Sequence, residues 1–169
     1  MSNEIVNRVS KSNLVTIDLE DFYPEGKRII FDISEWLYEG LILREKDFRE
    51  KVEQYDWSSF SDCYVALTCA TEAIIPAWAY LLITTKMSPF TKKVVVGDLE
   101  LLETVIFQEI ISNINTKDYI NKPVIIKGCT NKPIPPSASV QLIEKLIPFA
   151  KTIMFGEACS SVPLFKAKK

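Results

Sequence analysis

YVALTCATE, from Tyr64 to Glu72, is the stretch of sequence that decides the fold. An apolar run rich in strand-forming residues ends at a cysteine, and a sequence able to form a helix follows. The same order recurs downstream in KVVVGDLE (93–100), VIIKGCTNK (124–132) and TIMFGEACSS (152–161). Short apolar runs closed by small or polar residues are typical of buried strands. We therefore expect strands at Tyr64–Thr68, Lys93–Val96, Val124–Lys127 and Thr152–Phe155.

Helix-forming sequences fill the intervals between these strands. We expect helices at Glu72–Met87, Leu99–Asn113 and Ser137–Phe149, with Asp98 as the N-cap of the second. Strands that alternate with helices form βαβ units, in which helices cover both faces of a parallel sheet. The sequence thus predicts an α/β fold with a mainly parallel sheet of about four strands and flanking helices.

The segment before the first of these strands predicts an N-terminal extension. Leu14–Leu19 and Arg28–Ile33 have strand character, and the turn Tyr23–Gly26 between them carries Pro and Gly, which predicts a β-hairpin. A helix is expected at Arg44–Tyr55. We expect a single domain over residues 1–169, with the hairpin and helices in 1–62 and the βαβ core in 63–169.

Composition limits the chemistry that is available. The 169 residues include no histidine and carry a formal charge of −2. Without histidine, the usual general base, the Ser-His and Cys-His nucleophile pairs and imidazole metal ligands are excluded. The chain has no basic field for nucleic acid, no apolar run of the roughly 20 residues that span a bilayer, and no apolar signal-peptide core at its start. We expect a cytoplasmic protein with reduced cysteines that binds neither nucleic acid nor membrane.

Three of the four cysteines follow predicted strands. Ligands of parallel sheets bind beyond the carboxyl ends of the strands, so these cysteines are expected at one sheet edge, whereas Cys63 precedes its strand and lies at the opposite end. Thiolates with one acidic ligand suit zinc or an iron–sulfur cluster. The sequence therefore predicts a metal-binding protein. Its predicted ligands are Cys69, Cys129 and Cys159, with Asp98, Glu72 or Glu157 as the fourth.

Other interpretations of these residues stay open. The cysteines are equally well explained as small buried residues, because the chain has no CxxC motif. Cys69 or Cys129 at a helix N-terminus is a candidate nucleophile, but every arginine lies before residue 50, so none follows Cys129 to hold a phosphate. The acidic turn around Asp18 and Glu20 is interpreted as a solvated turn, because it lacks the spacing of a calcium loop.

A non-enzymatic, homodimeric interaction module is the alternative function. The helix that follows Thr71 is apolar almost all round, and Leu99–Asn113 has a broad apolar face. A small domain needs a partner, or a second copy of itself, to cover that much apolar surface. No catalytic residue and no organic cofactor site can be named from the sequence, which does not decide whether the protein is an enzyme.

Longer motifs carry a resemblance to a known family. They are EIVNRV (4–9), DLEDFYPEG (18–26), WLYEGLILREKDFRE (36–50), YVALTCATEAIIPAWAY (64–80), GDLELLETVIFQE (97–109), VIIKGCTNKPIP (124–135) and MFGEACSSVPLFK (154–166). Over essentially its full length the chain resembles domain-of-unknown-function family 2480, an uncharacterised bacterial family common in Bacteroidetes. The resemblance implies a single cytoplasmic domain of conserved length and brings no activity and no site residue.

Overall fold

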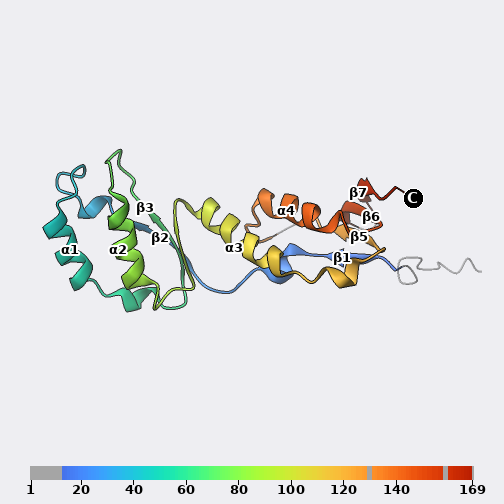
Figure 1. The fold of residues 1–169 in the computed structure, drawn as a ribbon, viewed down its shortest axis with the longest axis horizontal. Helices are drawn as coiled ribbons and strands as arrows, with labels where there is room; N and C mark the ends of the chain where they lie inside the picture. Colours follow the sequence, from blue (N-terminus) through green and yellow to red (C-terminus); the bar gives the residue numbers. More distant parts are fainter. Residues whose placement is uncertain (1–12, 129–130, 158–159, 169) are drawn as a thin grey trace, which may run out of the picture. The chain divides into compact units, whose positions relative to one another are not determined.

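Strand β3 (Tyr64–Thr68) lies between β2 (Arg28–Asp32) and β4 (Lys93–Val96) in a three-stranded parallel sheet. The predicted bounds of β3 and β4 are confirmed. The structure is a computed structural model that describes residues 13–128, 131–157 and 160–168 (Figure 1). Residues 65–67 of β3 have no exposed surface, because this strand has a neighbour on each side and side chains packed over it.

The chain has an α/β fold and divides into two units, each with its own sheet. Unit 1 comprises Met1–Tyr23 and Ile106–Lys169, and unit 2 comprises Pro24–Val105. The division falls inside helix α3 (Leu99–Asn113). No helix in the described part of the chain is long and apolar enough to cross a membrane.

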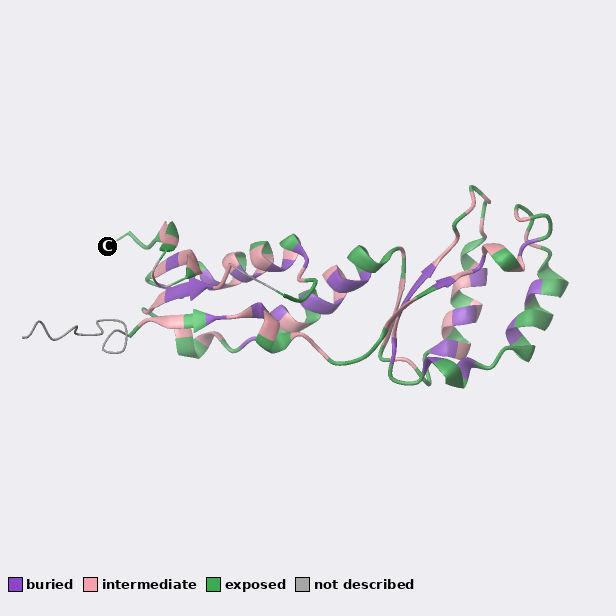
Figure 2. Cartoon of the chain, turned by 180° about the vertical axis from the view of Figure 1, so that it is seen from behind, coloured by how far each residue is buried: buried purple, intermediate pink, exposed green. Residues whose placement is uncertain are grey.

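Unit 2 is a run of βαβ units with its strands in sequential order, β2-β3-β4. Helix α1 (Glu45–Gln54) connects β2 to β3, and α2 (Ala77–Met87) connects β3 to β4. Two short 3₁₀ helices, η2 (Ser34–Trp36) and η3 (Trp57–Phe60), lie in the connections around α1. The two α-helices contact each other, and the buried positions of α1 lie on one side of it (Figures 1 and 2).

An aromatic cluster fills the core of unit 2. The ring of Phe31 on β2 lies 5.3–5.6 Å from the rings of four other aromatic residues, in edge-to-face or tilted arrangements. These four are Trp36, Tyr55, Trp57 and Phe60. Such ring pairs each add about 0.5–1.5 kcal/mol beyond the area that they bury, so this cluster stabilises the connections on both sides of α1.

Unit 1 contains a four-stranded sheet in the order β1-β5-β6-β7. Its strands are β1 (Val15–Ile17), β5 (Pro123–Ile126), β6 (Thr152–Glu157) and β7 (Ser160–Lys166). The first three are parallel, and β7 is an antiparallel edge strand. The other elements are η1 (Leu19–Phe22), the end of α3, η4 (Thr116–Tyr119) and α4 (Pro136–Leu146).

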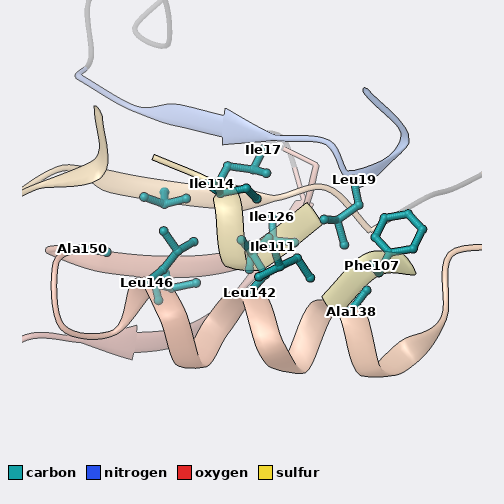
Figure 3. Packing of buried hydrophobic residues seen from close by; sticks show 12 residues of the cluster. Ile17, Leu19, Phe107, Ile111, Ile114, Ile126, Ala138, Leu142, Leu146 and Ala150 are labelled. Atoms are coloured by element: carbon teal, nitrogen blue, oxygen red, sulfur yellow. The ribbon is translucent and has the colours of Figure 1, made fainter. Parts of the chain in front are cut away.

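Helices α3 and α4 cover one face of this sheet. Ala138, Leu142 and Leu146 recur every four residues along α4, so they form one buried stripe. This stripe packs with Ile111 of α3 and Ile126 of β5 (Figure 3). The buried side chains of α4 follow the 3.6-residue period of a helix, and those of the strands follow a two-residue period. Together they therefore pack into a single core in unit 1.

The predicted N-terminal hairpin is wrong, and so is the single sheet. Strand β1 pairs with β5, while β2 pairs with β3 in the other sheet. Both strands were recognised, but their partners lie far along the chain, and long-range parallel pairing overrides the local turn sequence. Helix α2 also starts later than predicted, at Ala77, because the residue before Pro76 is disfavoured from helical geometry.

Candidate functional site

An ion pair lies at the carboxyl edge of the sheet in unit 1. Asp18 directly follows β1 and Lys127 directly follows β5, and their Oδ2 and Nζ atoms are 2.6 Å apart. The hydrogen bond from Lys127 lowers the pKa of Asp18 below its ordinary value of 3.8, and the same bond raises the pKa of Lys127. The nearby charges of Glu157 and Glu20 raise the pKa of Lys127 further. Three strand ends therefore bring charged groups close together.

Asp18 is held in place by a second hydrogen bond. Its Oδ1 atom accepts the backbone N–H of Glu20 at 2.9 Å and so caps η1. The carboxylate thus satisfies a helix-end donor with one oxygen and an ammonium group with the other. This arrangement fixes where the chain turns after β1.

Glu20 and Lys132 anchor the loop that follows β5. The Glu20 carboxylate accepts the backbone N–H groups of Asn131 and Lys132. In return, Lys132 Nζ donates to the Glu20 carbonyl oxygen at 3.0 Å and lies 5.4 Å from the centre of the Tyr23 ring. The chain on both sides of residues 129–130 is therefore bound to the segment that follows β1.

The ends of β5 and β6 approach each other closely. A Cβ atom added at Gly128 would lie 3.3 Å from the Cα atom of Gly156 and 3.1 Å from the Phe155 ring. Gly156 has a φ of +119°, and a Cβ there would lie 2.7 Å from the carbonyl oxygen of Ser160. Glycine at these two positions permits backbone approaches that a side chain would prevent. Lys127 and Gly128 therefore lie next to Gly156 and Glu157.

The predicted metal ligands divide between the two units. Cys129 and Cys159 lie outside the described residues, while Glu157 is exposed at the end of β6. Cys69, Glu72 and Asp98 follow β3 and β4, which belong to the sheet of unit 2. The prediction that all six residues lie at one sheet edge is therefore wrong, because the strands belong to two sheets. Metal binding itself stays a prediction, and no three metal-ligating side chains cluster among the residues that the structure describes.

The residues predicted in unit 2 have local roles. Asp98 caps α3, as predicted, by accepting the N–H of Leu101 at 2.8 Å. The half-buried Cys69 has its sulfur 3.4 Å from the hydroxyl of Thr71. Cys63 is buried, in agreement with the structural role expected for it. Glu72 is exposed in the loop before α2.

Asp32 organises the corresponding edge of unit 2. Its carboxylate accepts hydrogen bonds from the N–H and hydroxyl of Ser34 and from the N–H of Ala70, at 2.7–3.0 Å. Partial burial raises the pKa of Asp32, but these three hydrogen bonds outweigh that effect and lower it. Burial raises the pKa of Tyr80, and the charges of Cys69 and Asp32 add to the increase. Asp32 thereby ties together the loops that follow β2 and β3.

Sequence reasoning missed the roles of Asp18 and Glu20 and the hydrogen bond that links Asp32 to Ala70. The turn that contains Asp18 and Glu20 was interpreted as solvated, yet both carboxylates bind the chain around β5. The available signal was position, since Asp18 and Asp32 stand at the ends of predicted strands. Their partners could not be identified, because Asp18 and Lys127 are 109 residues apart in sequence.

Comparison with known proteins identifies a family and no individual relative. The family model described as "Protein of unknown function (DUF2480)" matches residues 3–167. No curated protein and no solved structure matches the chain. The match spans nearly the whole chain and confirms the resemblance drawn from the motifs. The chain therefore belongs to the DUF2480 family.

Proposed function

We propose that unit 1 binds a zinc ion through Cys129 and Cys159, with Glu157 as an acidic ligand. The observation that carries the proposal is the contact between the strand ends that lead to both cysteines, where Gly128 approaches Gly156. Cys129 directly follows Gly128, and Cys159 comes three residues after Gly156. Because consecutive Cα atoms are about 3.8 Å apart, residue 129 is one such step from Gly128 and residue 159 is at most three steps from Gly156.

The charges at this edge favour a cation. The edge carries three carboxylates (Asp18, Glu20 and Glu157) and two ammonium groups (Lys127 and Lys132), so its net formal charge is −1. Two thiolates would bring the net formal charge to −3. A neighbouring lysine also favours the thiolate form of a cysteine, which is the form that binds metal.

Zinc suits this donor set better than an iron–sulfur cluster. Zinc binds sulfur and carboxylate oxygen together in a four-coordinate site, whereas iron–sulfur clusters are usually held by four thiolates. Cys129 and Cys159 are the two cysteines in the sequence of unit 1, since Cys63 and Cys69 belong to unit 2. We therefore narrow the sequence-based choice of zinc or iron–sulfur to zinc.

Elemental mass spectrometry on protein purified without oxygen tests the proposal. We expect about one zinc per chain, and its loss in Cys129→Ser and Cys159→Ser. Cys63→Ser and Cys69→Ser are matched controls in unit 2 and should retain the metal. A zinc content that is unchanged in both unit 1 variants would overturn the proposal, and loss in Cys69→Ser as well would restore the three-thiolate hypothesis.

A homodimeric interaction module is the second candidate function. Helix α2 buries Ala79, Ile83 and Met87, yet Leu81 on the same helix is 65% exposed. An apolar side chain this exposed on a regular helix is a candidate contact with a second copy. Sedimentation of the wild-type chain and of Leu81→Lys tests this idea, and a wild-type chain that is monomeric at high concentration contradicts it.

A further inference from the structure

Three loops gather at the carboxyl edge of the sheet in unit 2. They are residues 33–44 after β2, residues 69–76 after β3 and residues 97–98 after β4. Because the three strands are parallel, their following loops leave the sheet at the same edge. Figure 1 shows the loops after β2 and β3 at the same end of unit 2.

Exposed apolar side chains are concentrated at this edge. Ile74 in the second loop is 93% exposed, and Leu41 and Ile42 in the first loop are 60% and 54% exposed. The apolar rim consists of Tyr38, Leu41, Ile42, Ile74, Val96 and Leu99. A single exposed apolar residue needs no explanation, but several at one edge of one unit indicate an interaction surface.

The first loop has a fixed conformation. Tyr38 and Ile42 form a β-bridge, with the N–H of Tyr38 donating to the Ile42 carbonyl oxygen at 2.8 Å. Glu39 and Gly40 turn the chain between them with φ values of 51° and 71°. The Arg44 guanidinium lies over the Tyr38 ring, 3.2 Å from its centre. The bridge therefore holds Leu41 at the tip of a turn whose backbone conformation is fixed, which lowers the conformational entropy lost on binding.

The second loop is attached to the first. Asp32 accepts hydrogen bonds from Ser34 at the start of the first loop and from Ala70 in the second. Ile74 is four residues beyond Ala70, between this anchor and the start of α2. The two most apolar parts of the rim are thus joined through a single carboxylate.

The charges on these loops indicate the charge that a partner should carry. The loops and the first turn of α3 carry five exposed acidic residues and one base, Arg44, for a formal charge of −4. The acidic residues are Glu35, Glu39, Glu72, Asp98 and Glu100. Two copies of this surface would repel each other, and an anionic membrane would be repelled as well. A cationic segment with one apolar face matches both the charge and the exposed side chains.

We propose that the carboxyl edge of unit 2 docks a cationic amphipathic segment of a protein partner. The apolar rim contacts the apolar face of the segment, and the five acidic side chains pair with its lysines or arginines. This recognition mode is that of an amphipathic helix whose apolar residues anchor it to an apolar surface. The proposal uses only residues of unit 2 and does not depend on the zinc site.

The probe is a fluorescein-labelled helical peptide of leucine and lysine, about 14 residues long, with leucine at i, i+3, i+4 and i+7. Its controls are a scrambled peptide of the same composition and a peptide with glutamate in place of lysine. We expect fluorescence anisotropy to show binding of the amphipathic cationic peptide to the full chain. Binding should be at least tenfold weaker for both control peptides. Equal binding of the scrambled peptide would overturn the proposal.

Variants of the protein locate the binding. Ile74→Ser and Leu41→Ser should each weaken peptide binding severalfold, and Glu72→Lys should weaken it and reduce its dependence on salt. The matched controls are Val140→Ser and Glu144→Lys on α4 of unit 1, which should bind as the wild type does. All five side chains are exposed in the folded protein, so the substitutions should not unfold it. Unchanged binding in Ile74→Ser and Leu41→Ser would overturn the proposal.

Discussion

At the scale of single residues, carboxylates at strand ends hold the fold together. Asp18 and Asp32 each follow or end a parallel strand, and each accepts hydrogen bonds from the chain beyond a neighbouring strand. Both have a lowered pKa. A group whose pKa is lower in the folded state than in the unfolded state stabilises the protein above its unfolded pKa, and that stability is lost as the pH falls through the folded pKa.

Asp18→Asn isolates the charge of Asp18, because asparagine is also a good N-cap. We expect the variant to melt at a lower temperature than the wild type at pH 7. The difference should shrink as the pH falls below 3.8, the ordinary pKa of Asp18, and should vanish once the wild-type carboxylate is protonated. Thermal unfolding at a series of pH values measures this. Asp21→Asn, an exposed change in the same turn, is the control, and a difference that persists at the acidic end would show that the ion pair is not its cause.

Asp32→Ala removes the acceptor of three hydrogen bonds at the edge of unit 2. The expected cost is about 1–2 kcal/mol of unfolding free energy, because the N–H of Ala70 loses its acceptor and the Ser34 donors lose theirs. Chemical denaturation measures the loss. Asp47→Ala, on the exposed side of α1, should change stability by less than about 0.5 kcal/mol. Equal effects of the two changes would mean that the Asp32 network contributes nothing.

At the scale of elements, helix α4 depends on its buried stripe. Leu142 has no exposed surface and belongs to the core of unit 1. Leu142→Ala should cost about 2–5 kcal/mol through lost burial and the cavity that it leaves. Val140 on the same helix is exposed, so Val140→Ala should cost less than about 0.5 kcal/mol. Denaturation followed by circular dichroism compares the two, and a mild effect of Leu142→Ala would contradict the place of Leu142 in the core.

Strand β6 requires a glycine at position 156 for two separate reasons. Gly156 has a positive φ, and a Cβ there would lie 2.7 Å from a backbone oxygen, whereas Gly40 also has a positive φ but has no atom within 4 Å of its Cβ position. Gly40→Ala should therefore cost only about 1 kcal/mol of backbone strain. Gly156→Ala should cost clearly more, because backbone must move. A comparison of the two melting temperatures tests this, and a Gly40→Ala variant as unstable as Gly156→Ala would exclude the steric contribution.

Local sequence signals predicted the elements well and their partners poorly. The bounds of β3, β4 and α3 were predicted correctly, because β-branched runs, helical periodicity and caps are encoded within a few residues. The pairing of Val15 with Val124 is not encoded in this way. Strand order, and with it the composition of each candidate site, depends on which apolar faces meet across the whole chain. The expectation that Cys69, Cys129 and Cys159 follow strands of one sheet was wrong for this reason.

At the scale of the whole molecule, the zinc proposal predicts that metal removal affects one unit only. A chelator such as EDTA should accelerate amide hydrogen exchange in β5 and β6, because the ion would stabilise the strand ends that lead to its ligands. Exchange in β3 of unit 2 should not change. Mass spectrometry of exchanged peptides separates the two units. If the chelator accelerated exchange equally in both units, or did not accelerate it in either, the result would contradict a zinc site confined to unit 1.

The division of the chain into units has a consequence for synthesis on the ribosome. Unit 2 is one uninterrupted stretch, Pro24–Val105, whereas unit 1 is formed from the segments that precede and follow it. Unit 2 can therefore fold as soon as it leaves the exit tunnel. Strand β1 must wait for β5, which is translated more than 100 residues later, a delay of several seconds at roughly 5–20 residues per second. Unit 2 therefore emerges complete before β5 does, and until β5 emerges β1 has no partner strand in the nascent chain.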